Sequence, residues 1–302
     1  MVKIAYHQSF AHPLPPGHRF PMIKYELIPQ QLLHQGIIDE DQLFEPTPIS
    51  EDIVVDAHDL DYWLSLRDLT LTPKEQRRIG FPLTAELVDR ELRIANGTVQ
   101  GALLAQRYGI AFNTAGGTHH AGTNWGEGFC MLNDQAIAAK YLLNSKLAKS
   151  ILIIDLDVHQ GNGTAQIFCD EPAVFTFSMH GEKNFPFRKE QSDLDIGLND
   201  GCSDEEYLSK LEESLSFFEK NIQPDFIFYL AGVDVLATDK LGKLMLTKSA
   251  CQKRDELVFQ FCQRKRIPVQ VSMGGGYSTD IRDIVDAHCN TFKSGIDIFE
   301  EL

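Results

Sequence analysis

Two aspartates and a histidine stand at alternate positions in the apolar run "ILIIDLDVHQGNG", residues 151–163. Val, Ile and Leu in succession are typical of a strand that is buried on both faces of a parallel sheet. Asp155, Asp157 and His159 would share one face of that strand, because side chains alternate along extended chain. Ionised carboxylates buried there are costly unless they have a partner. The run therefore indicates either a structural ion pair or a bound cation.

A further acid, Asp234, follows the apolar run "FIFYLAG". Together with Asp157 and His159 it gives two carboxylates and one imidazole. With one position left open for water, this is the ligand set of a catalytic Zn²⁺ site, whereas closed structural zinc sites usually use cysteine. We therefore predict that Asp157, His159 and Asp234 bind one Zn²⁺.

Adjacent histidines, His119 and His120, lie in the glycine-flanked segment "AGGTHHAG". Such a pair suits a general base and an electrostatic partner, of which one takes a proton from water and the other donates to a leaving amine. Tyr277 follows three glycines in "GGGY", where its hydroxyl would donate to a developing oxyanion. Taken singly, each of these side chains is equally well explained as a packed core residue. Their combination predicts metal-assisted amide hydrolysis.

Elements with strand and helix patterns alternate along the chain. The predicted strands span residues 2–6, 110–114, 150–158, 174–179, 226–231 and 268–273. The predicted helices span residues 97–108, 134–145, 203–221, 248–264 and 279–292. This alternation predicts an α/β protein built from βαβ units around a mainly parallel sheet. The proline-rich segment 11–21 is expected to be a loop, and residues 39–95 mostly helix and loop.

The polar motifs fall where the predicted strands end. "AGGTHHAG", "DLDVHQGNG", "SMHGEKNFPF", "AGVDVLATD" and "GGGYS" each end or follow one of them. Ligands of open α/β sheets bind beyond the carboxyl ends of the strands. We therefore expect these five loops to assemble one site.

Composition limits the classes of partner and the setting. The formal net charge is -15, which argues against direct nucleic-acid binding, because phosphate contacts need a basic surface. The six cysteines are scattered without a CxxC pair, as expected in the reducing cytoplasm. No apolar stretch is long enough to span a bilayer, and the start "MVKIAYHQSF" lacks the pattern of a signal peptide.

Several motifs together resemble the zinc-dependent histone deacetylase family of the arginase–deacetylase superfamily. They are "GGTHHAGTNWGEGFCMLND", "IDLDVHQGNGT", "LAGVDVLATDKLG" and "GGGY". "HQGNGT" and "KRDELVF" are most similar to the class IV branch and its bacterial relatives. The resemblance is dense over residues 97–292. It implies a single three-layer α/β/α catalytic domain over residues 1–302, with a central, mainly parallel sheet.

The resemblance implies the same three zinc ligands and assigns roles around them. His120 would be the general base, and His119 an electrostatic or acid partner oriented by Asp155. Asn162 stands where some members have a second aspartate, so the base would be less strongly polarised here. Tyr277 would donate to the scissile carbonyl.

The resemblance also implies a tunnel for an acylated lysine of a protein or peptide. Phe129 and Phe185 would line it, with Leu241 at its wall and the Gly128 carbonyl near the substrate amide. The family also carries a structural K⁺, which the resemblance places near Asp155, Asp157, His159, Ser178 and Met179.

Several alternatives remain open from the sequence. An arginase-like ureohydrolase with two Mn²⁺ would need further acidic ligands, whereas "DVHQGN" offers Gly161 and Asn162. A catalytically inactive acyl-lysine or metabolite-binding protein would be expected to have lost a ligand, the base or the tyrosine. Acetyl-lysine, longer fatty acyl-lysine and acetylpolyamine are all open as substrates, as are the oligomeric state and the choice between Zn²⁺ and Fe²⁺.

Overall fold

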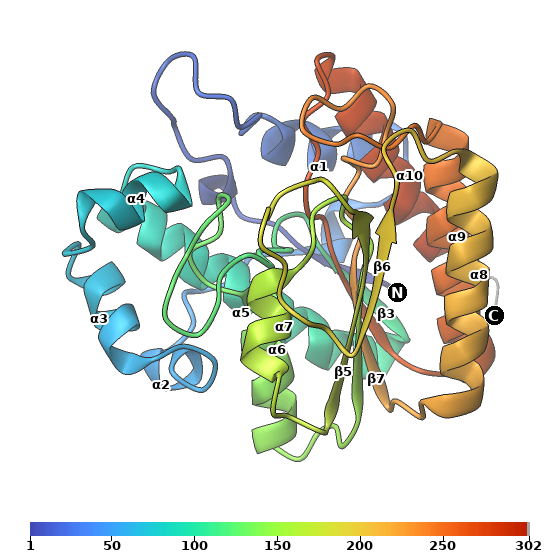
Figure 1. Ribbon diagram of the computed structural model, residues 1–302, viewed down its shortest axis with the longest axis horizontal. Helices are drawn as coiled ribbons and strands as arrows, with labels where there is room; N and C mark the ends of the chain where they lie inside the picture. Colours follow the sequence, from blue (N-terminus) through green and yellow to red (C-terminus); the bar gives the residue numbers. More distant parts are fainter. Residues whose placement is uncertain (301–302) are drawn as a thin grey trace.

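The computed structural model describes residues 1–300, which form one eight-stranded sheet with helices on both faces (Figure 1). Each neighbouring pair of strands is parallel, in the order β2-β1-β3-β8-β7-β4-β5-β6. The strands are β1 (Lys3–Ala5), β2 (Leu43–Phe44), β3 (Ile110–Asn113), β4 (Ile151–Asp155), β5 (Val174–Gly181), β6 (Leu194–Leu198), β7 (Phe226–Leu230) and β8 (Val269–Ser272). The predicted three-layer α/β/α fold with a parallel sheet is confirmed.

In the second half of the chain, the helices predicted at 134–145, 203–221 and 248–264 are found within one residue of those bounds, whereas the last helix extends to Glu300, eight residues beyond the predicted end at 292. Residues 1–300 form ten α-helices in all. They are α1 (Lys24–His34), α2 (Glu51–Val54), α3 (Leu60–Arg67), α4 (Pro73–Ile79), α5 (Ala85–Tyr108), α6 (Asp134–Asn144), α7 (Asn162–Phe168), α8 (Asp204–Asn221), α9 (Lys248–Lys265) and α10 (Ile281–Glu300). Two short 3₁₀ turns, Gln8–Phe10 and Glu40–Gln42, precede α1 and β2. Ser203 caps α8, since its hydroxyl accepts a hydrogen bond from the Glu206 N–H at 3.3 Å.

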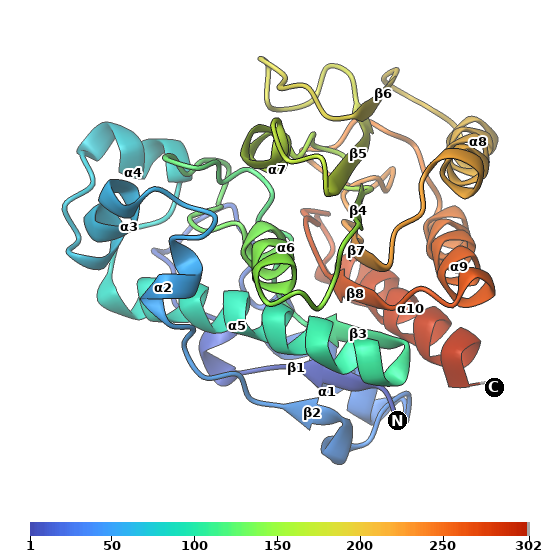
Figure 2. The ribbon, with the colours of Figure 1, turned by 90° about the horizontal axis from the view of Figure 1, so that it is seen from below.

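Figure 2 shows the sheet between its two helical layers. Helices α5, α6 and α7 cover one face, and α8, α9 and α10 cover the other; α1 packs on α10. The small helices α2, α3 and α4 lie outside the first layer. Strands β3, β4, β7 and β8 are buried along their whole length, which explains their unbroken apolar sequences.

Two elements differ from the sequence expectation, one in the first half of the chain and one at an edge of the sheet. Helix α5 begins at Ala85, twelve positions before the predicted start at 97, where the Thr84 hydroxyl accepts from the Leu87 N–H. Strand β6 was not predicted because it is an edge strand that carries Asp195 and Gly197 among apolar residues.

Within residues 1–300, no helix combines the length and apolar character needed to cross a membrane. All six cysteines are free.

Candidate metal centre and active site

The register of the sheet brings the carboxyl ends of the central strands to one level. Asp155 at the end of β4 pairs with Ser178 on β5 and with Leu230 on β7. Leu230 in turn pairs with Ser272 on β8, and Ser272 with Asn113 on β3. The loops that follow these strands therefore leave the sheet side by side, which is how five separate motifs come to surround one cavity.

The three predicted zinc ligands converge in this structure. Nδ1 of His159 lies 3.0 Å from Oδ1 of Asp157 and 3.2 Å from Oδ2 of Asp234. All three side chains are buried, Asp234 completely. Within residues 1–300 this is the one group of three or more histidine, cysteine or acidic side chains whose ligand atoms are close enough to hold a metal ion.

The donor set fits a single divalent cation. Apart from its ion-pair contact with His159 at 3.2 Å, the buried Oδ2 atom of Asp234 has no partner and accepts no hydrogen bond, although its Oδ1 accepts from the Val158 N–H at 3.0 Å. A buried carboxylate oxygen without a donor is costly unless a cation neutralises it. Tetrahedral zinc with bonds of 2.0–2.1 Å would hold its ligand atoms about 3.3 Å apart, close to the spacing found here. The residues present therefore fit Zn²⁺.

The charges within the triad of Asp157, His159 and Asp234 also favour a bound cation. Burial by itself would lower the pKa of His159, but the carboxylates of Asp157 and Asp234 raise it to about 10. Burial and the nearby charge of Asp157 raise the pKa of Asp234 to about 7. Two acids in one dry site are thus stabilised only with a proton or a cation between them.

The two adjacent histidines point into the same cavity with different partners. Nδ1 of His119 donates to Oδ2 of Asp155 at 2.6 Å, and Nδ1 of His120 donates to Oδ1 of Asn162 at 2.7 Å. Burial lowers the pKa of His119, but the charges of Asp155 and Asp157 outweigh it and raise that pKa overall. Burial and the neighbouring histidines lower the pKa of His120 well below its usual value. The surroundings therefore favour the charged form of His119 and the neutral form of His120.

Tyr277 is held by the loop that follows β8. Its N–H donates to Oδ2 of Asp239 at 2.6 Å, and the Gly275 N–H donates to Oδ2 of Asp157 at 2.8 Å. A Cβ at Gly275 would collide with the carboxylates of Asp234 and Asp157, so the loop approaches the triad this closely because it has glycine there. Burial and the charges of Asp234 and Asp157 raise the pKa of Tyr277 well above its usual value, so its hydroxyl stays a donor.

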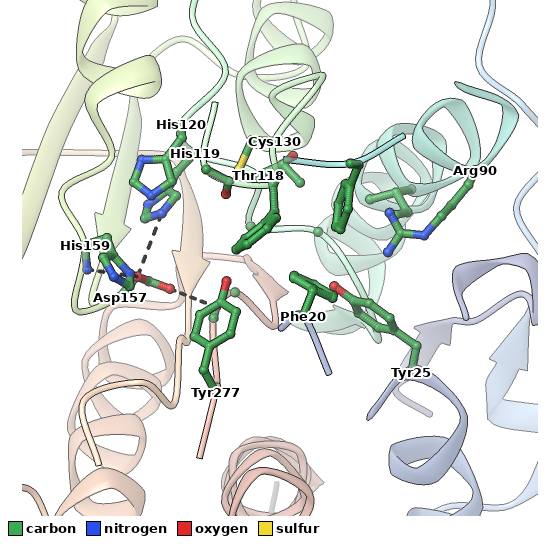
Figure 3. Close-up of a pocket in the computed structure, with 18 residues that line it drawn as sticks. Phe20, Tyr25, Arg90, Thr118, His119, His120, Cys130, Asp157, His159 and Tyr277 are labelled. Carbon is green, nitrogen blue, oxygen red and sulfur yellow. Dashed lines mark hydrogen bonds and ion pairs between the residues drawn. The ribbon is translucent and has the colours of Figure 1, made fainter. Parts of the chain in front are cut away.

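Figure 3 shows the cavity these groups surround. His119, His120, His159 and Asp157 lie on one side, and Tyr277 faces them. Beyond them the cavity continues inward, past Phe20 and Tyr25 to Arg90. The whole cavity, from the histidines to this inner chamber beside Arg90, measures about 40 Å³.

An outer funnel of about 390 Å³ leads from the same side chains to the surface. The four predicted substrate-binding residues all line it: Gly128, Phe129, Phe185 and Leu241. The ring of Phe185 lies 5.0 Å from that of His120. Phe129 packs against the inner Phe20 at 5.1 Å between ring centroids. The aromatic walls are thus present on both sides of the approach to His120.

The residues proposed for K⁺ lie together at the ends of β4 and β5, but their side chains already have partners. Asp155 accepts from His119 and, through Oδ1, from the Asp157 N–H at 3.1 Å. The Ser178 hydroxyl lies 3.0 Å from Nδ1 of His180. Asp155 and Ser178 therefore leave no side-chain oxygen without a partner, and the K⁺ site stays a prediction.

Four residues of the site were missed from the sequence. Glu127 bonds to Asn162, Asp239 holds the Tyr277 loop, Lys24 donates from its buried Nζ to the Gly274 carbonyl at 2.9 Å, and Arg90 closes the inner chamber. Glu127 and Asp239 lie within the quoted motifs, where each is an acidic residue to which the sequence analysis gave no role. Those unassigned acids were the signal that could have identified them. The segments around Lys24 and Arg90 carry no local signal.

Comparisons with known proteins agree with the fold and the site. The model of the histone deacetylase domain matches residues 18–292. An uncharacterised protein of Picosynechococcus sp. is 45% identical over 98% of this chain and 99% of its own length. Histone deacetylase 2 of Arabidopsis thaliana is 29% identical over 92% of this chain and 75% of its own length.

Solved structures give the same answer. The crystal structure of a histone deacetylase homologue from Aquifex aeolicus has a TM-score of 0.82 and 25% identity, and covers 99% of this chain and 88% of that one. A homologue complexed with SAHA gives a TM-score of 0.83 over the same shares of the two chains.

Sheet order, site and matches together define an α/β protein of the arginase–deacetylase superfamily. Within that superfamily the chain belongs to the histone deacetylase family, because the domain model matches nearly all of it. The predicted resemblance is confirmed, and with it an amidohydrolase of the deacetylase type.

Proposed function

We propose that this protein is a Zn²⁺-dependent hydrolase that removes acetyl groups from lysine side chains of proteins or peptides. The observation that carries the proposal is the convergence of Asp157, His159 and Asp234, with one carboxylate oxygen left without a donor, beside His120 at the base of an aromatic funnel. Bound there, zinc would act as a Lewis acid toward the scissile carbonyl and lower the pKa of the attacking water.

The protein's own groups supply the proton transfers. His120 is neutral, and because its Nδ1–H is engaged by Asn162, its Nε2 lone pair is free to take the proton of the water. His119, whose charged form is favoured by its pairing with Asp155, donates to the leaving lysine amine. Tyr277 keeps its phenolic proton and donates to the carbonyl oxygen as negative charge develops there.

The inner chamber favours a short acyl group. The cavity at the site has a volume of about 40 Å³, which provides room for a short acyl group. The side chains that enclose it include the buried Tyr25 and Arg90, and Arg90 Nε donates to the Phe10 carbonyl at 2.8 Å. A long chain would have to displace these packed groups, so acetyl-lysine is the substrate we assign.

Other features stay predictions at this stage. These are the class IV affinity, the K⁺ site, a single catalytic domain over residues 1–302, and the cytoplasmic setting. All six cysteines being free is compatible with that setting.

A panel of acyl-lysine peptides from acetyl to myristoyl tests the proposal, with the metal content of the same preparation measured and a hydroxamate chelator as control. Acetyl-lysine should be hydrolysed fastest, and one zinc per chain should be found. No hydrolysis of any acyl-lysine by a fully zinc-loaded protein would overturn the proposal, and faster cleavage of myristoyl-lysine would overturn its acyl specificity.

A further inference from the structure

The mouth of the active-site funnel is lined by positive charge. Five of the residues that line it are cationic and exposed: Arg19, Arg77, Arg78, Lys183 and Lys243. No aspartate or glutamate is among its lining residues, all of which lie in the described part of the chain. The whole chain has 43 acidic against 28 basic residues, so its composition would lead one to expect an acidic rim.

Three of these cations have no acidic partner. Arg78 pairs with Glu127 at 2.6 Å, and Lys243 lies 3.9 Å from Asp200. Among residues 1–300, no carboxylate lies within 4.0 Å of the charged groups of Arg19, Arg77 or Lys183. The rim therefore keeps a net positive charge after its own ion pairs are counted.

The local structure accounts for only part of this arrangement. Arg77 and Arg78 lie in the last turn of α4, where cations are favoured by the helix dipole. Arg19 lies in the loop before α1, with its guanidinium 5.0 Å above the Phe129 ring. Lys183 follows β5, in a different part of the chain. Three segments that are far apart in sequence thus place unpaired cations at the same opening. The helix dipole accounts for Arg77 but not for Arg19 or Lys183, which lie in loops.

We propose that this rim selects substrates in which acidic residues flank the acyl-lysine, and this rests on the function proposed above. A lysine whose acyl group reaches His159 leaves its neighbouring residues at the mouth, because consecutive Cα atoms are only about 3.8 Å apart. Unpaired charges around a cleft with low-dielectric walls focus the field there and attract ligands of opposite sign. The same field disfavours acetylpolyamines and lysine-rich peptides, since both carry positive charge to the rim.

The test compares acetyl-lysine peptides of one length with Asp and Glu, Ser, or Lys and Arg on both sides. The acidic peptide should have a kcat/KM at least about tenfold above that of the basic one. Raising NaCl to about 1 M, where the Debye length is about 3 Å, should remove most of the preference. Equal values for the three peptides, or faster cleavage of acetylspermidine than of the acidic peptide, would overturn the proposal.

Variants locate the effect at the rim. Arg19→Glu combined with Lys183→Glu should reverse the preference, so that the basic peptide has a higher kcat/KM than the acidic one. Lys220→Glu is the matched control, because Lys220 is exposed in the last turn of α8, which leads to the amino end of β7, whereas the site lies at the carboxyl ends of the strands. Arg19→Gln and Lys183→Gln, with thermal unfolding measured, serve if the charge reversals impair folding. An unchanged preference in folded rim variants would overturn the assignment to these residues.

Binding of the same peptides, followed by fluorescence anisotropy, separates the two proposals. Hydrolysis of all three peptides with equal affinity would keep the deacetylase and reject the rim. Tighter binding of the acidic peptide without hydrolysis of any would keep the rim and reject the deacetylase.

Discussion

The side chain of Asn162 is oriented by Glu127. Its amide nitrogen donates to Oε1 of Glu127 at 2.6 Å, while its amide oxygen accepts from Nδ1 of His120 at 2.7 Å. A carboxylate can only accept, so the amide must present its NH₂ to Glu127 and its oxygen to His120. Glu127 thus sets the tautomer of His120 through the intervening side chain of Asn162, and leaves the Nε2 lone pair of His120 facing the cavity. Arg78 holds the other oxygen of Glu127.

Replacing Glu127 with Gln should weaken this orientation, because a glutamine can present either donor or acceptor to Asn162. We expect kcat to fall by roughly 10-fold with KM nearly unchanged, as for loss of part of a general base's contribution. Steady-state kinetics on an acetyl-lysine peptide with a Ser flank give both constants. A rise in KM of about the same factor, with kcat unchanged, would show that Glu127 acts on substrate binding instead.

Replacing Asn162 with Asp places a negative charge beside His120 and should raise its pKa. Because the base must be neutral to accept a proton, the acid limb of the kcat/KM profile should move to higher pH. Asn162→Ala is the control, since it removes the orientation without adding a charge and should lower the rate without that upward movement. The pH profiles of the three proteins decide between the outcomes.

Tyr277→Phe and Asp234→Ala should separate catalysis from metal binding. Loss of one oxyanion donor costs about 10²–10³ in kcat, so Tyr277→Phe should lose activity on that scale and retain zinc. Asp234→Ala removes a ligand and should lose the zinc as well as the activity. Metal analysis after gel filtration, beside the kinetics, checks both; full turnover by Tyr277→Phe would remove the tyrosine from the mechanism.

Zinc affinity should fall as the pH falls. The pKa of His159 is raised to about 10 and that of Asp234 to about 7 in the metal-free protein. Between pH 7 and pH 10 the ion must displace the proton of His159. Below about pH 7 it must also displace the proton of Asp234. Competition with a chelator of known affinity, repeated across this range, measures the slope. An affinity independent of pH would contradict the assignment of these ligands.

Acid should destabilise the fold through His58, which joins α2 and α3 to the loop that carries the catalytic histidines. Its Nδ1 donates to the Gly122 carbonyl at 2.9 Å and its Nε2 accepts from the Asn133 N–H at 3.0 Å. Burial lowers the pKa of His58 from 6.5 to about 4. The folded state therefore disfavours the charged ring, and stability present above pH 6.5 is lost as the pH falls toward 4.

The size of this loss is about 3 kcal/mol for a shift of that extent. Denaturant unfolding of wild type and His58→Gln at several pH values should show a shallower pH dependence for the variant. Other buried histidines such as His288 titrate in both proteins, so the difference isolates His58. Parallel curves would mean that His58 is not the acid-sensitive group.

Much of this fold could be predicted because short continuous stretches of sequence carry the pattern of each strand and motif. The buried strands β3, β4, β7 and β8 are short apolar runs, and the motifs at their ends contain the residues that meet at the triad. Spacing alone placed Asp157 and His159 on one side of the chain, and their atoms do converge. The start of α7 at Asn162 was not foreseen, because its glycine-rich sequence is typical of a loop.

What escaped prediction depends on contacts between distant segments. Lys24 reaches Gly274 across 250 positions, and the charge of the rim exists only after α4, the loop before α1 and the loop after β5 meet. Strand β2 has only two residues, too few for a periodic pattern. No local pattern encodes such relations, since each side chain alone is an ordinary surface or core residue.

The sheet order places β8, the last strand to be synthesised, between β3 and β7. Its ladders with β3 and β7 are the strand pairing that joins the half of the sheet bearing His119 and His120 to the half bearing the two acids, and the loop after it carries Tyr277. A chain that ends before residue 269 would therefore lack both this pairing and the phenol donor. We expect such a chain to be inactive although its three metal ligands and both histidines are present.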